Sequence, residues 1–132
     1  MPKRTKGEFN VTGWDEDTYR ETGDKGKLTR AHIAQDYTGD LVAKGTWDLL
    51  MCYLSDGTAV FTGLGQVDGK LGDRKGSFVV ESRGTYDGKA ARSNWRGIPG
   101  SGTGSFVGLK GKGRSVAPHG STGTYDLDLA TD

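Results

Sequence analysis

The glycine-rich segment 99–113, "PGSGTGSFVGLKGKG", is the first place where residue types and spacing could do chemistry, because glycines beside lysines can cradle a phosphate. A dinucleotide fingerprint requires glycine at its first, third and sixth positions, and counting from Gly100 or from Gly102 the sixth position is not glycine. A P-loop requires Ser or Thr after its Gly-Lys pair, where this chain has Gly113. The spacing therefore argues against a phosphate site.

Side chains that bind metals or act as nucleophiles are few and scattered. His32 and His119 are the only histidines and Cys52 is the only cysteine, whereas a metal site needs ligands clustered at defined spacing. We therefore expect no metal and no cofactor. His119, in the turn 118–120, is the better functional candidate of the two histidines, and a solvated loop histidine is its alternative reading. No Ser–His–Asp or Cys–His pair can be argued from the spacing, so catalytic residues stay unassigned and the sequence leaves open whether the protein is an enzyme.

The composition limits the kind of protein that could carry such side chains. A chain of 132 residues with a net charge of +1 predicts one domain, 1–132, without a general attraction to nucleic acid or to a membrane. A single cysteine allows no internal disulfide, and the start "MPKRTKGEF" lacks the apolar region of a signal peptide. No run approaches the roughly 20 apolar residues of a membrane span. These features predict a cytoplasmic protein.

The elements that must position these side chains are strands, because apolar and polar residues alternate along most of the chain. The segment 15–26 is polar and bears glycine, so we expect a loop there. Short turns between strands favour antiparallel neighbours, and closing the sheet removes its exposed edges. The prediction is an all-β protein, a single eight-stranded antiparallel barrel, with a two-sheet sandwich as the alternative. The expected strands are 7–14, 28–38, 41–54, 58–68, 77–86, 89–98, 112–118 and 121–129.

Nine segments, in this order and spacing, resemble a bacterial family known as domain of unknown function 3224: "FNVTGWDE", "LTRA", "YTGDL", "GTWDLLMCY", "FTGL", "GSFVV", "PGSGTGSFVGLKGKG", "APHG" and "GTYDLDL". The glycine segment is also similar to one found in allene oxide cyclase and dirigent-type barrels. That resemblance implies an eight-stranded barrel in which Phe106 plugs the interior. Family members often carry an acidic residue where this chain has Gly65 and a histidine where it has Ser82, so a catalytic role is not carried over.

Strand alternation predicts an apolar, aromatic interior in which only hydroxyl groups and Gln35 are polar. Such an interior suits a small, largely apolar organic molecule, and a completely filled core is the alternative. The resemblance implies that a bound molecule could be a substrate of a cofactor-free cyclase or isomerase. A non-catalytic binding or sequestering protein is the rival hypothesis. The residues expected to bind the ligand are Tyr37, Trp47, Met51, Tyr53, Phe61, Phe78, Ser82, Trp95 and Tyr125.

Two features of the outward-facing positions suggest partners other than a small molecule. Leu50, Cys52 and Leu54 are apolar where the strand should face water, which indicates an oligomer interface, with a dimer favoured, or coverage by the 15–26 loop. Basic residues lie on the same outward face of consecutive strands and could form a stripe that binds an anionic partner. A solvated face is the stronger interpretation, and we expect no nucleic acid. The stripe consists of Arg92, Arg96, Lys112 and Arg114.

Overall fold

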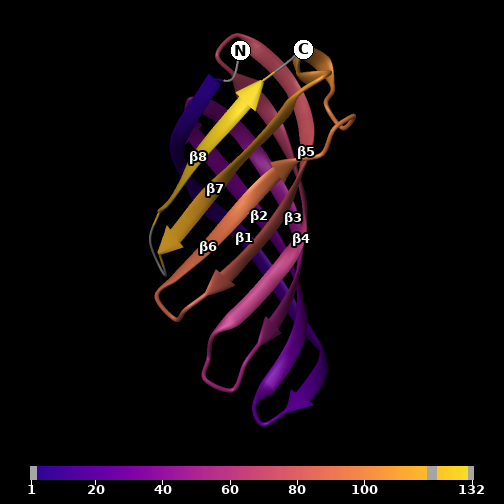
Figure 1. The fold of residues 1–132 in the computed structure, drawn as a ribbon, viewed down its shortest axis with the longest axis vertical. Coiled ribbons are helices and arrows are strands. Elements are labelled where there is room, and N and C mark those ends of the chain that lie inside the picture. Colours follow the sequence, from indigo (N-terminus) through magenta and orange to yellow (C-terminus); the bar gives the residue numbers. More distant parts are fainter. Residues whose placement is uncertain (1–2, 119–121, 131–132) are drawn as a thin grey trace.

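The computed structural model describes residues 3–118 and 122–130, and it shows a closed barrel of eight antiparallel strands in sequence order (Figure 1). Closure occurs where the first strand pairs with the last, with Lys3 opposite Leu129 and Phe9 opposite Gly123. The predicted barrel is confirmed, and the sandwich alternative is wrong. The strands are β1 (Lys3–Gly23), β2 (Gly26–Gly39), β3 (Leu41–Tyr53), β4 (Ala59–Leu71), β5 (Arg74–Tyr86), β6 (Ala90–Gly97), β7 (Lys110–Pro118) and β8 (Gly123–Ala130).

The alternation of side chains between interior and solvent follows the sequence pattern closely. Along β3, burial alternates at every position from Leu41 to Met51. Alternation along 7–14 predicts that Phe9 and Val11 face the interior, but Val11 is exposed. The other residues predicted to face inward are buried, except that Tyr53 is partly buried at one end of the barrel. Because successive side chains on a strand point to opposite faces, this agreement fixes the register of the interior.

Strand β1 is much longer than the sequence pattern indicates, and the loop expected at 15–26 is wrong. The strand continues to Gly23 and pairs with β2 up to a two-residue turn, where Asp24 and Lys25 both have positive φ. Register shifts interrupt β1 at three places, the first between Val11 and Gly13, and each shift breaks the alternation that would have indicated a strand.

The far part of the β1–β2 hairpin projects beyond the barrel. Strand β8 pairs with β1 only up to Phe9, so among the described strands β2 alone pairs with the rest of β1. Figure 1 shows this hairpin extending past the other turns at the end opposite the two termini. The bulge after Val11 places Trp14 opposite Ile33, so Trp14 lies on the interior side of the sheet. The hairpin therefore forms an overhang beside one mouth of the barrel.

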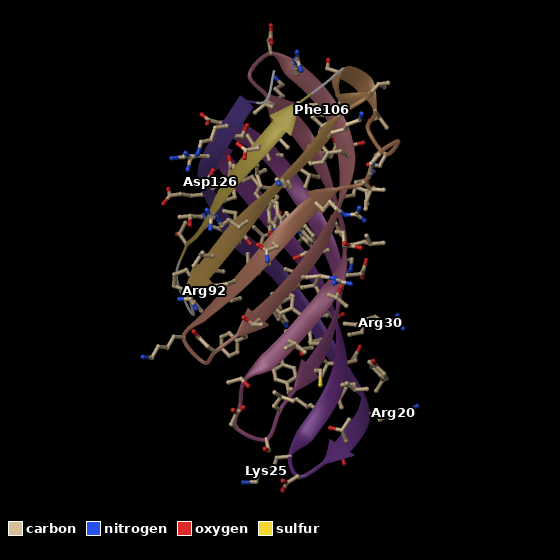
Figure 2. The ribbon with its side chains drawn as sticks, in the orientation of Figure 1. Arg20, Lys25, Arg30, Arg92, Phe106 and Asp126 are labelled. Carbon is tan, nitrogen blue, oxygen red and sulfur yellow. The ribbon has the colours of Figure 1, made fainter. Side chains whose placement is uncertain are left out.

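The other mouth is closed by the glycine-rich segment that links β6 to β7. Its short 3-10 helix, η1 (Gly104–Phe106), ends on Phe106, which is only 1% exposed and packs edge-on against Phe78 at a ring distance of 5.4 Å. Figure 2 shows Phe106 near this end and Lys25 at the opposite end. The segment is attached to β5, because Thr103 N donates to Ser77 O at 2.8 Å. The plug that the resemblance implied is confirmed.

Glycines inside the strands make room for large side chains. A Cβ at Gly65 would collide with the indole of Trp47, and one at Gly84 would collide with the ring of Phe61. A Cβ at Gly123 would similarly collide with the ring of Phe9. Each aromatic ring therefore lies flat across a neighbouring strand at the position where that strand has no side chain. This arrangement accounts for some of the 23 glycines of the chain, and others have positive φ in the turns.

Candidate functional site

The half of the barrel beneath the β1–β2 overhang contains a cavity of about 740 Å³. It opens between the tips of the strands, beside Trp14, Tyr53 and Pro118, and it extends inward as far as Trp47 and Trp95. The described side chains that line it are mostly apolar, and none of them is Asp, Glu, Lys, Arg or His. The interior is thus neither completely filled nor completely open.

The floor of the cavity is a layer of aromatic rings that crosses the barrel. The rings of Trp47 and Trp95 are 5.1 Å apart, and Tyr37 lies beneath them with its ring 6.0 Å from that of Trp95. Phe9 completes the layer, 5.8 Å from Tyr37. Such tilted and edge-to-face pairs are favourable arrangements for aromatic side chains. The layer separates the cavity from the filled half of the barrel.

Most of the predicted ligand-binding residues come together at this cavity. Tyr37 lies just below its floor, and two others lie in the filled half: Phe78 packs against Phe106, and the hydroxyl of Tyr125 donates to Thr38 O at 2.6 Å. The roles of all nine predicted residues in ligand binding stay predictions. The predicted residues that line the cavity are Trp47, Met51, Tyr53, Phe61, Ser82 and Trp95.

Two buried side chains, Trp47 and Tyr37, and the partly buried Gln35 form a chain of hydrogen bonds at the floor. The indole Nε1 of Trp47 donates to the hydroxyl of Tyr37 at 2.8 Å, and that hydroxyl donates to Oε1 of Gln35 at 2.6 Å. Burial raises the pKa of the Tyr37 hydroxyl, so it stays protonated and remains a donor. Gln35 itself lines the cavity.

A second polar cluster lies on the opposite wall, on β6 and β7. The hydroxyl groups of Ser93 and Ser115 are 2.5 Å apart, and the indole Nε1 of Trp95 donates to Ser93 at 3.1 Å. Ser82 on β5 also lines the cavity, and its hydroxyl makes no hydrogen bond to another described residue. The polar groups of the cavity are thus uncharged and lie on different walls.

Glu16 holds the overhang to the rim of the cavity, and sequence reasoning missed it. Its Oε2 accepts hydrogen bonds from Thr29 at 2.6 Å and Tyr53 at 2.8 Å, and its Oε1 accepts one from the indole of Trp14 at 2.9 Å. Burial alone would raise the pKa of Glu16, but these three hydrogen bonds outweigh it and lower the pKa. The opposite holds for Tyr53, whose pKa is raised by burial and by its bond to Glu16.

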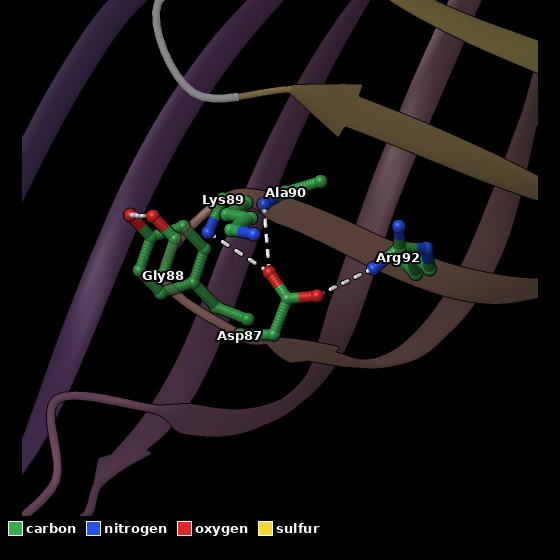
Figure 3. A network of polar contacts seen from close by, with 6 residues as sticks. Asp87, Gly88, Lys89, Ala90 and Arg92 are labelled. Carbon is green, nitrogen blue, oxygen red and sulfur yellow. Dashed lines mark hydrogen bonds and ion pairs between the residues drawn. The ribbon is translucent and has the colours of Figure 1, made fainter.

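The turn between β5 and β6 stabilises another part of the rim. Asp87 Oδ1 accepts hydrogen bonds from the backbone N–H groups of Lys89 and Ala90, both at 2.9 Å, and Oδ2 accepts one from Arg92 at 2.7 Å (Figure 3). The backbone bonds first, and then the bond from Arg92, lower the pKa of Asp87. The turn joins Tyr86 to the start of β6 and so positions the adjacent cavity wall.

The other chemically active residues do not join this site. His32 lies on the outer surface, where its Nδ1 is 2.9 Å from Asp48. His119 lies outside the described residues. Cys52 is partly buried on the outer side of β3 and has a free thiol. No group of three or more potential metal ligands occurs within 3–118 and 122–130.

The outer apolar face of β3 and β4 is left uncovered in the single chain. Leu50 is 50% exposed and Leu54 is 48% exposed, so segment 15–26, the alternative to an oligomer interface, does not cover them completely. Val60 and Leu64 on the neighbouring strand are also exposed and extend the face. A dimer formed through this face stays a prediction.

The basic stripe carries less free charge than its sequence suggests. Arg92 pairs with Asp87, and Arg96 pairs with Glu81 at 3.6 Å. On the adjacent β8, Asp126 lies opposite Arg114 and Asp128 lies opposite Lys112 in the strand register. Acidic side chains thus interleave with the basic ones. A solvated face remains the stronger interpretation of the stripe.

Within the part of the chain that is described, no helix has the length and apolar character needed to cross a membrane. Comparison with curated proteins gives no match. The sequence matches a family model over residues 5–129, described as "Protein of unknown function (DUF3224)".

The fold is similar to a crystal structure of a protein with unknown function from the same family, from Shewanella oneidensis MR-1. The TM-score is 0.83 at 25% identity, and the match covers 100% of this chain and 99% of the other. With the family model matching nearly the whole sequence, the chain belongs to the DUF3224 family.

Proposed function

We propose that the protein binds a small, largely apolar organic molecule in the cavity beneath the β1–β2 overhang. The observation that carries this proposal is the cavity itself, whose volume of about 740 Å³ lies within the range of pockets that hold small ligands. Its lining is mostly apolar with a few polar groups, which is the usual composition of such pockets.

The absence of charged side chains among the described lining residues favours a neutral ligand. Moving an ionised group from water into an apolar site is costly unless an opposite charge or several hydrogen bonds meet it. The described lining residues offer no charged side chain that could do so. We therefore expect the molecule to be uncharged in the part that enters the barrel.

Non-catalytic binding is better supported than the cyclase or isomerase hypothesis. Among the described lining residues only Tyr53 and Tyr86 have titratable side chains, and the Tyr53 hydroxyl donates a hydrogen bond to Glu16. The raised pKa of Tyr53 makes it a poor acid near neutral pH. A cyclase here would depend on confining its substrate in one reactive shape rather than on proton transfer.

A cavity-filling substitution tests the proposal. Met51→Trp adds bulk inside the cavity, and Leu50→Trp adds the same bulk on the outer face of the same strand. The neutral fluorescent probe N-phenyl-1-naphthylamine should bind the wild-type protein and Leu50→Trp with similar affinity, and Met51→Trp at least about tenfold more weakly. Equal binding by both variants would place the probe outside the barrel. Native mass spectrometry after gentle purification would show a retained natural ligand directly.

A further inference from the structure

We propose that the ligand is a neutral molecule with a carbonyl oxygen, and that the side-chain N–H of Gln35 donates a hydrogen bond to that oxygen. This inference rests on the proposed function, because it names the chemical class of the molecule that the cavity holds. It comes from the direction of the hydrogen bonds at the cavity floor.

The direction of each hydrogen bond in the Trp47–Tyr37–Gln35 chain follows from what each group can do. An indole N–H is only a donor, so the Tyr37 hydroxyl accepts from Trp47. Tyr37 must then donate its own hydrogen elsewhere, and the side-chain atom of Gln35 lies 2.6 Å away. A separation this short is typical of O–H···O rather than N–H···O bonds. The atom that faces Tyr37 is therefore the carbonyl oxygen of Gln35.

The orientation of the Gln35 amide also determines what its nitrogen can bind. Tyr37 holds the amide oxygen of Gln35, so the amide cannot flip its oxygen and nitrogen without breaking the Tyr37–Gln35 hydrogen bond. The amide nitrogen makes no hydrogen bond to another described residue, and Gln35 lines the cavity. An amide nitrogen is a donor only, so the group it meets in the cavity must be an acceptor.

The backbone is built to allow this chain. A Cβ at Gly45 would contact the Tyr37 ring, the Tyr37 hydroxyl and the indole nitrogen of Trp47. Gly45 lies opposite Gln35 in the register of β2 and β3. The absence of a side chain at this position leaves the space in which the hydroxyl and the indole nitrogen meet.

The serine groups on the other walls do not select a ligand in the same way. Ser93 and Ser115 share one of their two hydroxyl hydrogens in their mutual bond, so one hydrogen is left to donate. A hydroxyl group can also accept, so the serines can adapt to either kind of partner. Gln35 is the group that defines the class of ligand, because its free atom can only donate.

The absence of charge in the lining narrows the acceptor to a neutral one. A carboxylate would accept from Gln35, but its charge would meet no cationic side chain among the described lining residues. A ketone, aldehyde, ester or tertiary amide oxygen accepts without that cost, and unlike a hydroxyl it adds no donor that would need a partner in the apolar lining. The predicted ligand is therefore an apolar molecule that carries one such carbonyl group.

A matched pair of probes tests the inference. 2-Acetylnaphthalene and 2-ethylnaphthalene have the same ring skeleton, and only the first carries a carbonyl oxygen. We expect the wild-type protein to bind the ketone roughly tenfold more tightly than the hydrocarbon by titration calorimetry, as one well-placed hydrogen bond allows. Gln35→Leu should bind both equally. Gln66→Leu, the same change at an exposed position on the outer face of β4, is the matched control and should keep the preference.

The carbonyl stretch of the bound ketone gives a second readout that does not depend on affinity. Labelled with ¹³C at the carbonyl, the ketone should absorb at lower frequency in the wild-type cavity than in Gln35→Leu. Tyr37→Phe should partly remove the shift, because it releases the Gln35 amide to rotate.

Each outcome separates the two proposals. If both probes bind the wild-type protein equally, the carbonyl inference is overturned and the proposed function stands. An unchanged preference in Gln35→Leu also overturns the role of Gln35. If neither probe binds, the proposed function fails and this inference fails with it. Should Gln35→Leu not fold, Tyr37→Phe decides: an unchanged carbonyl frequency of the bound ketone in that variant overturns the role of Gln35.

Discussion

The two halves of the barrel share one sheet but differ in what fills them. In the closed half, Phe106 enters between the strands and packs against Phe78, and the interior is occupied by side chains. In the open half, the same strands surround a cavity of about 740 Å³. Alternation of residues therefore decides which side chains face inward, while the size of those side chains and an inserted plug decide whether space remains.

The halves also differ in how their polar groups are satisfied. In the closed half, the Tyr125 hydroxyl binds backbone groups of Thr38 and Leu41. In the open half, Gln35 and Ser82 keep hydrogen-bonding capacity that no described residue uses. Buried polar groups are usually satisfied, and in the closed half the buried hydroxyl of Thr5 is an exception without a partner. In the open half the unused groups face the cavity, where a ligand can complete the interactions.

Removing the plug should have the largest effect on this contrast. We expect Phe106→Ala to lower the free energy of unfolding by about 3–5 kcal/mol, because it leaves a void in a well-packed region. Phe61→Ala removes the same ring from the wall of the existing cavity, and it should cost at least about 1 kcal/mol less. Urea unfolding of both variants checks the difference. Equal losses would mean that the two halves are packed alike.

A side chain at Gly65 should disturb the layer that separates the halves. Gly65→Ala forces the Trp47 indole to move, and we expect a loss of about 1–3 kcal/mol in the free energy of unfolding. Gly97→Ala is the matched control, since its added Cβ would have no neighbour closer than 3.5 Å. Thermal and urea unfolding measure both. A cost at position 97 as large as that at 65 would contradict the role of the indole.

Releasing the overhang should have a smaller effect. Glu16→Gln removes the charge that strengthens three hydrogen bonds, and we expect a loss of about 1 kcal/mol. The pKa of Glu16 is lower in the folded than in the unfolded protein, so its stabilisation is complete above about pH 4.3. It is lost as the pH falls through the folded-state pKa.

Urea unfolding between pH 3 and pH 7 tests this dependence. The difference in stability between wild type and Glu16→Gln should be constant near neutral pH and should shrink in acid. Asp17→Asn, an exposed change on the same strand, serves as the control and should show a much smaller difference. A difference for Glu16→Gln that grows in acid would have the wrong sign.

The smallest effect on stability should come from the outer wall, which both halves share. Leu50→Lys should change the free energy of unfolding by less than about 0.5 kcal/mol, because the side chain is already half exposed. If the apolar face of β3 and β4 forms a dimer, sedimentation should show a dimer for the wild type and a monomer for Leu50→Lys. Thr46→Lys, on the same outer face, should remain dimeric. A monomeric wild type would remove the dimer prediction.

The barrel, its strand order and the inward-facing residues could be predicted from the sequence, because they follow from local alternation. That pattern indicated seven of the eight strands well and placed Trp47, Met51 and Trp95 in the interior, where they line the cavity. The plug formed by Phe106 in the glycine-rich segment could also be predicted, although only from the resemblance of that segment to known barrels.

The overhang and the carboxylate of Glu16 could not be predicted, because bulges interrupt the alternation of apolar and polar residues from which strands are predicted. Each register shift in β1 reverses the alternation, so Asp15 to Glu21 looks like a polar loop. Glu16 was one acidic residue among several there. Only Gly13, beside the first shift, marks the point at which Trp14 returns to the interior side.

The glycines that lie under aromatic rings also have an evolutionary consequence. The indole of Trp47 fills the space that a side chain at position 65 would need. A larger residue at 65 alone would therefore cause strain, and a smaller residue at 47 alone would leave a void. Related sequences should therefore show the two positions varying together, with a larger residue at 65 accompanied by a smaller one at 47. A lineage could reshape the floor of the cavity through such paired exchanges, and so acquire a different ligand, while the strand order stays the same.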